Sequence, residues 1–307
     1  MAIKTLISIV GPTAIGKTKM AIAIAKHFRT EIISADSRQF FKELYIGTAV
    51  PTPKELGTVP HNFIQHKSIF DKYSVGEFEK EAISLLKQLF ENHDMVVMVG
   101  GSGLYIDAVI NGLDEFPIVD PSIRESLNKT LHEEGIKVLQ KQLKELDRDY
   151  YTSMDIDNPH RLIRALEVCI CSGKPYSTFL KKKDTTRPFK TITIGLKADR
   201  EIIYERINHR VDIMIQQGLL EEVKNVFPYK TLNALQTVGY KELFKYLEGE
   251  WDLDFAIAEI KKNTRRFAKR QLTWYRKNES VIWFDHDLDE NEFLLQIDEK
   301  LAKLRNE

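Results

Sequence analysis

Short apolar runs alternate with amphipathic stretches in the N-terminal third of the chain. Runs at residues 3–10, 31–35 and 95–99 have the length of buried strands, and the first ends at Gly11. Residues 17–28 repeat apolar side chains at helical spacing, and Ser74 and Glu77 form a capping box that predicts the start of another helix. Residues 42–72 lack clear periodicity, so we expect loop there with a short strand near Phe63. Strands separated by helices predict an α/β fold with a parallel sheet flanked by helices.

The pattern becomes helical and highly charged from about residue 114. Helix starts are predicted at Asp120-Pro121 and Asn158-Pro159, where a capping residue precedes proline, and the second helix closes at Gly173. Strands return at residues 190–196 and 280–284, with helices predicted over 199–217 and 219–227 between them. We therefore expect an α/β core from residues 1–113 and 187–307, with an all-helical insertion domain over residues 114–186.

Composition narrows the class of protein. The 307 residues are 43% apolar and 29% charged, the balance of a soluble globular enzyme, and no apolar stretch approaches the length of a membrane span. Cys169 and Cys171 lie two residues apart on a predicted helix, which suits neither a disulfide framework nor a CxxC pair. We expect a cytoplasmic protein with no membrane association. The formal net charge is zero, so any nucleic-acid partner must be bound by a local concentration of basic residues.

A phosphate-binding loop follows the first predicted strand. The sequence Gly11-Pro12-Thr13-Ala14-Ile15-Gly16-Lys17-Thr18 fits the pattern G-x-x-x-x-G-K-[ST], with the strand before it and a helix after it that this motif requires. Backbone amides and the helix N-terminus would bind phosphate oxygens, Lys17 would neutralise them, and the Thr18 hydroxyl could ligate Mg²⁺. The alternative is a glycine-rich turn without a ligand. The strand at residues 95–99 ends in glycines without a carboxylate, which disfavours a motor or switch ATPase and suggests that the loop holds a leaving group.

Polar residues follow two further strands at the edge where ligands bind in such sheets. Asp36 comes directly after the strand at 31–35, and its position suits a general base, a magnesium ligand or a helix cap equally well. Ser102 and Gly103 follow the strand at 95–99, where they could bind substrate or simply turn the chain.

A strongly basic helix is predicted near the C-terminus. Residues 261–277 contain eight basic residues and no acidic one. At about 100° per residue, one half of this helix carries Lys262, Arg265, Arg266, Lys269, Arg270, Arg276 and Lys277, and the other carries Ile260, Phe267, Leu272, Trp274 and Tyr275. A solvated surface would explain such charges, but the absence of acids favours a polyanion such as a nucleic acid. Arg210 could either reach a diphosphate or form a surface ion pair.

Several motifs together resemble one known family. The segments GPTAIGKT, ISADSRQ, VGGSGLY, DNPHRLIRALEV, CSGKP, QTVGYKEL and RRFAKRQLTWYR occur in the order found in bacterial tRNA dimethylallyltransferases, also called tRNA isopentenyltransferases. The resemblance runs from about Ile7 to Arg276, nearly the whole chain. It implies transfer of a dimethylallyl group from dimethylallyl diphosphate to the exocyclic amine of the tRNA adenine next to the anticodon on its 3′ side.

The resemblance also assigns roles to residues. It implies that Asp36 is the general base, that Lys17 and Arg210 stabilise the leaving diphosphate with Mg²⁺, and that Ser102 replaces the more usual threonine while keeping its hydroxyl. The implied RNA contacts are Asp36, Ser37, Arg38, Gln39, Ser102, Arg124, His160, Arg161, Leu162, Ile163, Arg164, Gln236, Gly239, Tyr240, Lys241, Lys269, Arg270, Gln271 and Arg276. We expect a monomer whose basic helix holds the anticodon stem-loop while the adenine flips into the site.

Three other functions share some of these features. A prenyltransferase acting on free adenine nucleotides would use the same loop without needing the basic helix. A small-molecule P-loop kinase would transfer phosphate from ATP, and an RNA-binding protein without catalysis would not depend on Asp36.

Overall fold

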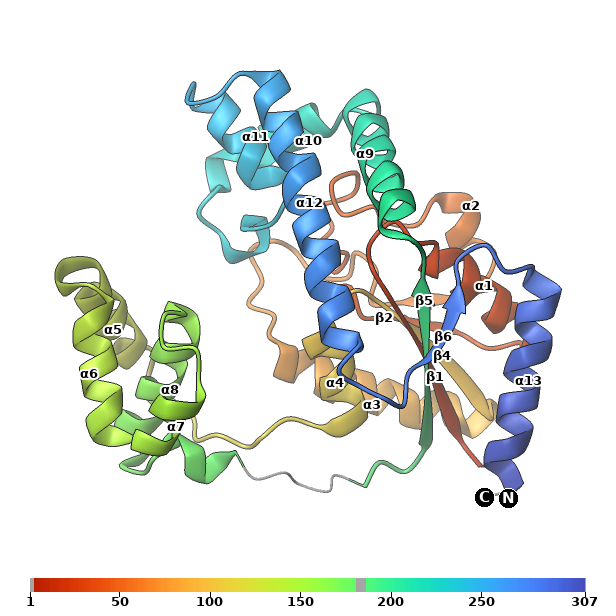
Figure 1. Cartoon of the computed structure of the whole chain (residues 1–307), viewed down its shortest axis with the longest axis horizontal. Coiled ribbons are helices and arrows are strands. Elements are labelled where there is room, and N and C mark those ends of the chain that lie inside the picture. The colour runs from red at the N-terminus through yellow and green to blue at the C-terminus, as the bar shows by residue number, and fades with distance from the viewer. Residues whose placement is uncertain (1–2, 181–185, 307) are drawn as a thin grey trace. The chain divides into compact units, whose positions relative to one another are not determined.

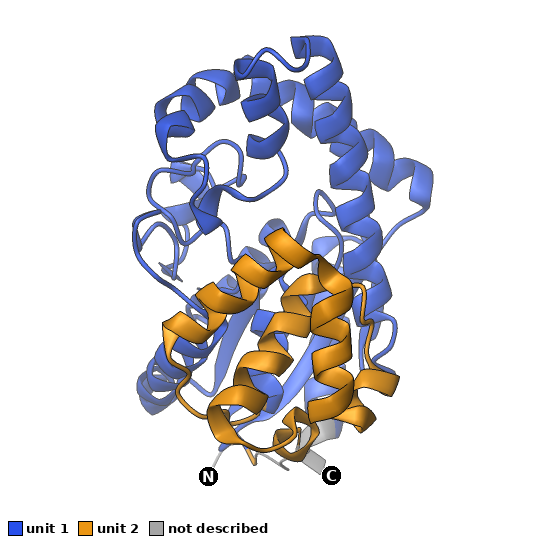
Figure 2. Cartoon of the chain, turned by 90° about the vertical axis from the view of Figure 1, so that its left-hand side faces the viewer, with its two compact units in different colours: residues 1–111, 187–307 blue, residues 112–186 orange. Residues whose placement is uncertain are grey.

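The computed structural model describes residues 3–180 and 186–306. The chain forms two compact units, one made of Met1–Asn111 and Arg187–Glu307 and the other of Gly112–Thr186 (Figure 2). Each unit has its own apolar core.

A six-stranded parallel sheet organises the first unit (Figure 1). Its strands are β1 (Thr5–Val10), β2 (Ile32–Ser34), β3 (His61–Asn62), β4 (Met95–Val99), β5 (Lys190–Lys197) and β6 (Ile282–Asp285), in the order β3-β2-β4-β1-β5-β6. All the neighbouring pairs run parallel, so the carboxyl ends of all six strands share one edge. The predicted α/β class with a parallel sheet is confirmed.

Helices cover both faces of this sheet because side chains alternate along each strand. Ile7 and Ile9 of β1 share a core with α1 (Lys17–His27) and α13 (Glu290–Asn306). Leu6 and Val10 point to the opposite face and pack with α3 (Val75–Asn92) and α4 (Gly103–Asn111). The strands are apolar throughout because both of their faces are buried.

A group of helices extends the first unit beyond the carboxyl edge of the sheet (Figure 1). It contains α9 (Arg200–Gln216), α10 (Leu219–Val226), the 3₁₀ turns η2 (Phe227–Tyr229) and η3 (Asn233–Leu235), α11 (Tyr240–Leu247) and α12 (Leu253–Tyr275). These helices share a third core with residues from the segment 41–69. The long helix α12 also packs against α4, so it connects this helical group to the loops of the sheet.

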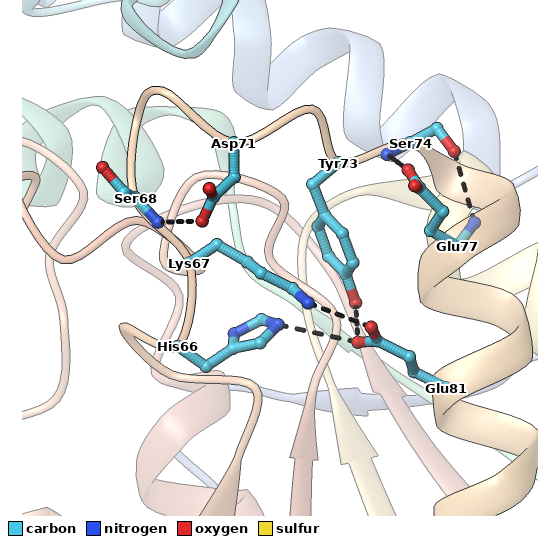
Figure 3. A network of polar contacts seen from close by, with 8 residues as sticks. All are labelled: His66, Lys67, Ser68, Asp71, Tyr73, Ser74, Glu77 and Glu81. Carbon is cyan, nitrogen blue, oxygen red and sulfur yellow. Dashed lines mark hydrogen bonds and ion pairs between the residues drawn. The ribbon is translucent and has the colours of Figure 1, made fainter.

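The segment between β2 and α3 is ordered by polar contacts. The sequence pattern predicts loop over residues 42–72, and the structure adds α2 (Pro53–Leu56), which is too short for its periodicity to be visible. Glu81 of α3 accepts hydrogen bonds from Lys67 and from the Tyr73 hydroxyl, each to a different carboxylate oxygen (Figure 3). The predicted capping box of Ser74 and Glu77 is confirmed at the start of α3.

The second unit consists of helices. These are α5 (Pro121–Glu134), α6 (Ile136–Leu146), α7 (Arg148–Ser153), α8 (Pro159–Ser172) and the 3₁₀ turn η1 (Tyr176–Phe179). Helices α5 and α8 begin with the predicted Asp120 and Asn158 caps, and α8 ends at Gly173 in a left-handed conformation. In the described part of the chain, no helix combines the length and the apolar character that crossing a membrane requires.

Candidate active site

A cavity of about 1460 Å³ opens at the carboxyl edge of the sheet in the first unit. The loop after β1, the loop after β2 and the loop after β4 line it, and these three strands are neighbours in the sheet. Helices α9 and α12 contribute further walls. Lys17, Asp36, Ser102 and Arg210, singled out from the sequence, all line this one cavity.

The loop between β1 and α1 has the backbone geometry of an anion-binding loop. Gly11 has φ 140°, and a Cβ atom there would lie 2.8 Å from the Leu196 carbonyl oxygen, so only glycine fits. Ala14 and Gly16 also have positive φ, at 65° and 107°. Helix α1 begins directly after Gly16, and its N-terminus carries the partial positive charge that favours phosphate.

Lys17 is the first residue of α1 and lies inside this loop. Its Nζ donates hydrogen bonds to the carbonyl oxygens of Gly11 at 3.0 Å and Pro12 at 2.8 Å. Burial lowers the Lys17 pKa to about 8, Asp36 opposes this shift, and Arg210 adds to it. An anion bound beside Lys17 would raise this pKa again, because a nearby negative charge stabilises the ammonium form.

Asp36 stabilises a turn at the carboxyl end of β2. Its Oδ1 accepts the backbone N–H of Arg38 at 3.1 Å, and the following residues form a turn, so this carboxylate does not cap a helix. Burial raises the Asp36 pKa, while the Arg38 N–H and the positive charge of Lys17 act in the opposite direction. The side chain keeps part of its surface in the cavity wall. A carboxylate of raised pKa facing a cavity suits a general base.

The donor chemistry of the loop fits a magnesium ion shared with a diphosphate. Among residues 3–180 and 186–306, no group of three or more histidines, cysteines or acids is arranged to hold a metal. A cation here would take most of its oxygen ligands from the diphosphate and from water, which is the usual way in which proteins bind Mg²⁺. Thr18 lies at the start of α1 and lines the cavity, and its hydroxyl would be a protein ligand for such an ion.

Ser102 connects the loops after β2 and β4. Its Oγ accepts the backbone N–H of Ser37 at 3.2 Å and lies 3.1 Å from the Ser37 Oγ. The two loops touch closely, because a Cβ on Gly100 would lie 2.5 Å from the Ala35 carbonyl oxygen. Ser102 therefore both faces the cavity and fixes the Asp36 turn.

Two arginines of α9 flank the phosphate loop. Arg210 lies in the cavity wall, where burial and the charge of Arg206 lower its pKa and Asp36 opposes the shift. This position favours the diphosphate-binding interpretation over a surface ion pair. Arg206, which the sequence analysis missed, donates from Nε to the carbonyl oxygen of Ala14 at 2.8 Å. It lies one helical turn before Arg210, and that spacing on one helix was the signal available in the sequence.

The basic helix α12 differs from the prediction in its buried side. Phe267 and Trp274 are 38% and 42% exposed, so the apolar half drawn from the sequence is wrong for both. Ile260 and Tyr275 are buried as predicted, whereas Ala268 and Gln271, which the prediction left out, complete the core-facing stripe. A helix packed on one side buries less than half of its circumference, so the buried stripe is narrower than the predicted half.

The charges of α12 also fall into two groups. Lys261 and Lys262 pair with Asp212 and Glu259, so the start of the basic stretch is compensated by acids from outside it. Within the described part of the chain, Lys269, Arg270 and Arg276 have no acidic side chain at ion-pair distance. Arg265 and Arg266 donate to the neutral side chains of Asn208 and Asn263, so among the described residues the positive charge is uncompensated from Arg265 to the end of α12.

Comparison with known proteins identifies the family. The IPP transferase family model matches residues 39–278 of the chain. The tRNA dimethylallyltransferase of Christiangramia forsetii is 62% identical over 296 residues, covering 96% of this chain and 98% of that protein. The chain belongs to the IPP transferase family. The resemblance drawn from the sequence motifs is thereby confirmed.

Other members of the IPP transferase family agree with this result. The tRNA dimethylallyltransferase of Flavobacterium johnsoniae is 57% identical over 304 residues, covering 97% of this chain and 98% of that protein. A solved tRNA isopentenylpyrophosphate transferase of Bacillus halodurans superposes with a TM-score of 0.73 at 35% identity, covering 99% of this chain and all of that one. A eukaryotic dimethylallyltransferase solved acting on tRNA gives a TM-score of 0.77 at 26% identity, over 92% of this chain and 74% of that chain.

Burial argues against direct RNA contact by several side chains that the resemblance suggested. Leu162 and Ile163 belong to the core of the second unit, where they are 0% and 5% exposed. Tyr240 is fully buried, and its hydroxyl donates to Glu222 at 2.6 Å. Gln271 is 5% exposed. The side chains of these four residues are packed inside the protein, so an RNA contact at these positions would have to use the backbone, and the predicted contacts stay a prediction.

Other members of the suggested RNA-contacting set keep accessible surface. His160 and Arg161 are exposed at the start of α8, and Gln236 and Lys241 are exposed beside the cavity. Ser37 and Gln39 line the cavity as well, and Gly239 lines it although it is buried. Arg38 donates to the carbonyl oxygens of Asn233 and Ala234, so it also supports the segment that leads to α11.

Two suggested RNA-contacting arginines of the second unit share one buried partner. Glu167 is only 3% exposed at its side chain, and it accepts from Arg124 through Nε at 2.6 Å and from Arg164 through Nη1 at 2.5 Å. Both guanidinium groups remain partly exposed, at 54% and 38%. The carboxylate thus holds two arginines side by side on the surface of this unit.

Glu222 of α10 is a supporting residue that the sequence did not indicate. Its carboxylate accepts the backbone N–H groups of Tyr45, Ile46 and Gly47 at 3.0, 2.7 and 2.9 Å, in addition to the Tyr240 hydroxyl. These contacts hold a loop that lines the cavity. No sequence signal could have found them, since the loop and Glu222 are some 175 positions apart.

Proposed function

We propose that this chain transfers a dimethylallyl group from dimethylallyl diphosphate to the exocyclic amine of the adenine on the 3′ side of the tRNA anticodon. Membership of the IPP transferase family supports the reaction class. The observation that carries the assignment is that a phosphate loop and a carboxylate of raised pKa line the same cavity. We expect the protein to act as a monomer in the cytoplasm.

The proposed chemistry divides into leaving-group and nucleophile halves. The carbon–oxygen bond between the allyl group and diphosphate breaks, and both bonding electrons leave with the diphosphate. The backbone amides of the phosphate loop, Lys17 and Arg210 would stabilise this negative charge as it develops. Bound Mg²⁺, held by the Thr18 hydroxyl and the diphosphate oxygens, would supply further charge neutralisation.

The nucleophile half depends on Asp36. The adenine amine is a weak nucleophile because its lone pair is delocalised into the ring, so it attacks as the allyl carbon becomes cation-like. A new carbon–nitrogen bond forms, and Asp36 accepts the proton that the nitrogen loses. Ser102, hydrogen-bonded to Ser37, would hold the Asp36 turn in place during this transfer.

The adenine must leave the anticodon loop to reach this cavity. Extruding a stacked base costs a few kcal/mol, which contacts to the RNA backbone must offset. The uncompensated cations at the end of α12 support such contacts, and Arg270 itself lines the cavity. The arginines held by Glu167 and the exposed start of α8 are further candidates.

A substrate panel tests the proposal against its rivals. The protein is incubated with Mg²⁺, dimethylallyl diphosphate and unmodified tRNA, and mass spectrometry of digested nucleosides looks for prenylated adenosine. Parallel reactions replace tRNA with AMP or ATP, or replace dimethylallyl diphosphate with ATP. Prenylation of tRNA alone is expected. Prenylated free nucleotide, or phosphoryl transfer from ATP, would instead support one of the two alternative enzymes.

A further inference from the structure

A buried glutamine joins α12 to the phosphate loop. Gln271 lies on the core-facing stripe of α12 and is 5% exposed. Its side-chain oxygen accepts the backbone N–H of Thr13 at 2.8 Å, and its Nε2 donates to the Gly101 carbonyl oxygen at 2.8 Å. One amide thus connects the loop after β1 to the loop after β4.

The surrounding backbone is shaped to admit this side chain. A Cβ atom on Gly101 would lie 2.2 Å from Gln271 Nε2, so a larger residue there would displace the end of this side chain. One turn further along α12, a Cβ on Gly103 would lie 2.5 Å from the indole nitrogen of Trp274, which donates to Asp107 of α4 at 2.9 Å. The position of α12 against these loops is therefore fixed at two successive points.

The Gln271 contact also determines which amides remain for phosphate. The Thr13 N–H is used by Gln271, so the amides that follow it in the loop are left to bind a diphosphate. The next residue, Ala14, is held through its carbonyl oxygen by Arg206 of α9. Two helices thus hold adjacent residues of the loop, at Thr13 N–H and at Ala14 C=O.

We infer that Gln271 is a positioning residue for the diphosphate, and that it supports catalysis through the phosphate loop without touching RNA. This inference rests on the proposed function. Gln271 is preceded in sequence by the exposed Lys269 and Arg270, which suit an RNA contact, but its own amide points into the protein. The residue therefore links the helix that carries the RNA-facing cations to the loop that holds the leaving group.

The first test is Gln271→Met, which keeps the length of the side chain and removes both hydrogen bonds. We expect the KM for dimethylallyl diphosphate to rise on the order of tenfold or more, because the loop amides lose their fixed position. The Kd for tRNA, measured by filter binding without the diphosphate, should stay within about twofold of the wild type. Thr273→Ala, at an exposed position on the same helix, is the matched control and should change neither quantity.

The second test, Gln271→Glu, gives a readout that a purely structural role would not produce. A carboxyl group buried here has a raised pKa. In its neutral form it can accept from Thr13 and donate to Gly101, as the glutamine does, whereas the ionised form cannot donate. The ratio of the variant's KM for dimethylallyl diphosphate to that of the wild type should therefore fall as the pH is lowered from 8 to 6.

The outcomes separate the inference from its alternatives. If Gln271→Met binds tRNA more weakly and its KM for the diphosphate is unchanged, Gln271 is an RNA contact and the inference is overturned. Wild-type values of both the Kd for tRNA and the KM for the diphosphate would overturn it as well. If the methionine variant fails to fold by thermal melting, the glutamate variant decides, and a KM ratio independent of pH would overturn the inference. A wild-type protein that prenylates nothing would refute the proposed function instead, so the two failures are distinguishable.

Discussion

Replacing Asp36 with asparagine removes the proposed base while preserving the turn in which it lies. The Asp36 Oδ1 accepts the Arg38 backbone N–H at 3.1 Å, and the oxygen of an asparagine amide can accept the same bond. The substitution also relieves the cost of ionising a buried carboxylate, a cost that is evident in the raised pKa of Asp36. The variant should therefore fold with a melting temperature equal to or slightly above that of the wild type.

The expected loss of rate follows from the role of a positioned base. General-base catalysis contributes about 10²–10⁴-fold, which corresponds to roughly 3–5 kcal/mol of activation free energy. Asp36 also raises the Lys17 pKa, so its neutralisation should lower that pKa further below about 8. A second measurement at pH 6, where Lys17 of the variant carries more of its charge than at pH 7, separates this effect from the loss of the base.

The assay is steady-state transfer from labelled dimethylallyl diphosphate to unmodified tRNA. Asp36→Asn should reduce kcat by about 10²–10⁴-fold while the Kd for tRNA stays nearly unchanged. Asp36→Ala, which also removes the acceptor of the Arg38 N–H, should lose the same activity and melt at a lower temperature. A kcat for Asp36→Asn within tenfold of the wild type would refute the role of Asp36 as the base.

Four further outcomes follow from the structure. Affinity for dimethylallyl diphosphate should fall as the pH rises through about 8, where Lys17 loses its proton. An affinity that does not change between pH 7 and pH 9.5 would contradict this. Joint replacement of Lys269 and Arg270 by glutamine should weaken tRNA binding and reduce the slope of log K against log salt by about two, with an unchanged slope counting against RNA contact. Glu222→Ala removes the acceptor of four hydrogen bonds and should lower the free energy of unfolding by about 3 kcal/mol in denaturant titrations. The control Glu221→Ala, at the exposed neighbouring position, should change it by less than about 0.5 kcal/mol. Burial lowers the His66 pKa to about 4, so between about pH 6.5 and 4 the imidazole binds a proton in the unfolded chain and not in the folded one. The free energy of unfolding should therefore fall as the pH falls through this range, and His66→Phe should flatten that dependence. The same pH profile of stability in the variant and the wild type would refute this role of His66.

The fold was predictable where the relevant signals are local. Strand ends, the capping box of Ser74 and Glu77, and the proline-started helices each depend on a few consecutive residues. The phosphate loop also lies within eight residues, and Asp36 could be placed beside it because parallel strands end at one edge of the sheet. These features came from periodicity and from simple topology.

The supporting contacts were not predictable because they join distant parts of the chain. Gln271 lies 258 positions from Thr13, and nothing in the sequence around either residue indicates that they meet. The exposure of Phe267 and Trp274 likewise depends on which side of α12 meets α4, which the spacing of apolar residues does not specify. Motif resemblance suggested an RNA-facing role for Gln271, whereas packing turned its amide inward.

The most direct test of the account is a structure of the protein with a tRNA anticodon stem-loop and a non-hydrolysable analogue of dimethylallyl diphosphate. The measurement is the distance from the Asp36 carboxylate to the exocyclic nitrogen of the target adenine. We predict a separation within hydrogen-bond reach, roughly 2.6–3.2 Å, with the diphosphate on the loop beside Lys17 and Arg210. An adenine bound outside the cavity, or a diphosphate held away from this loop, would contradict the account.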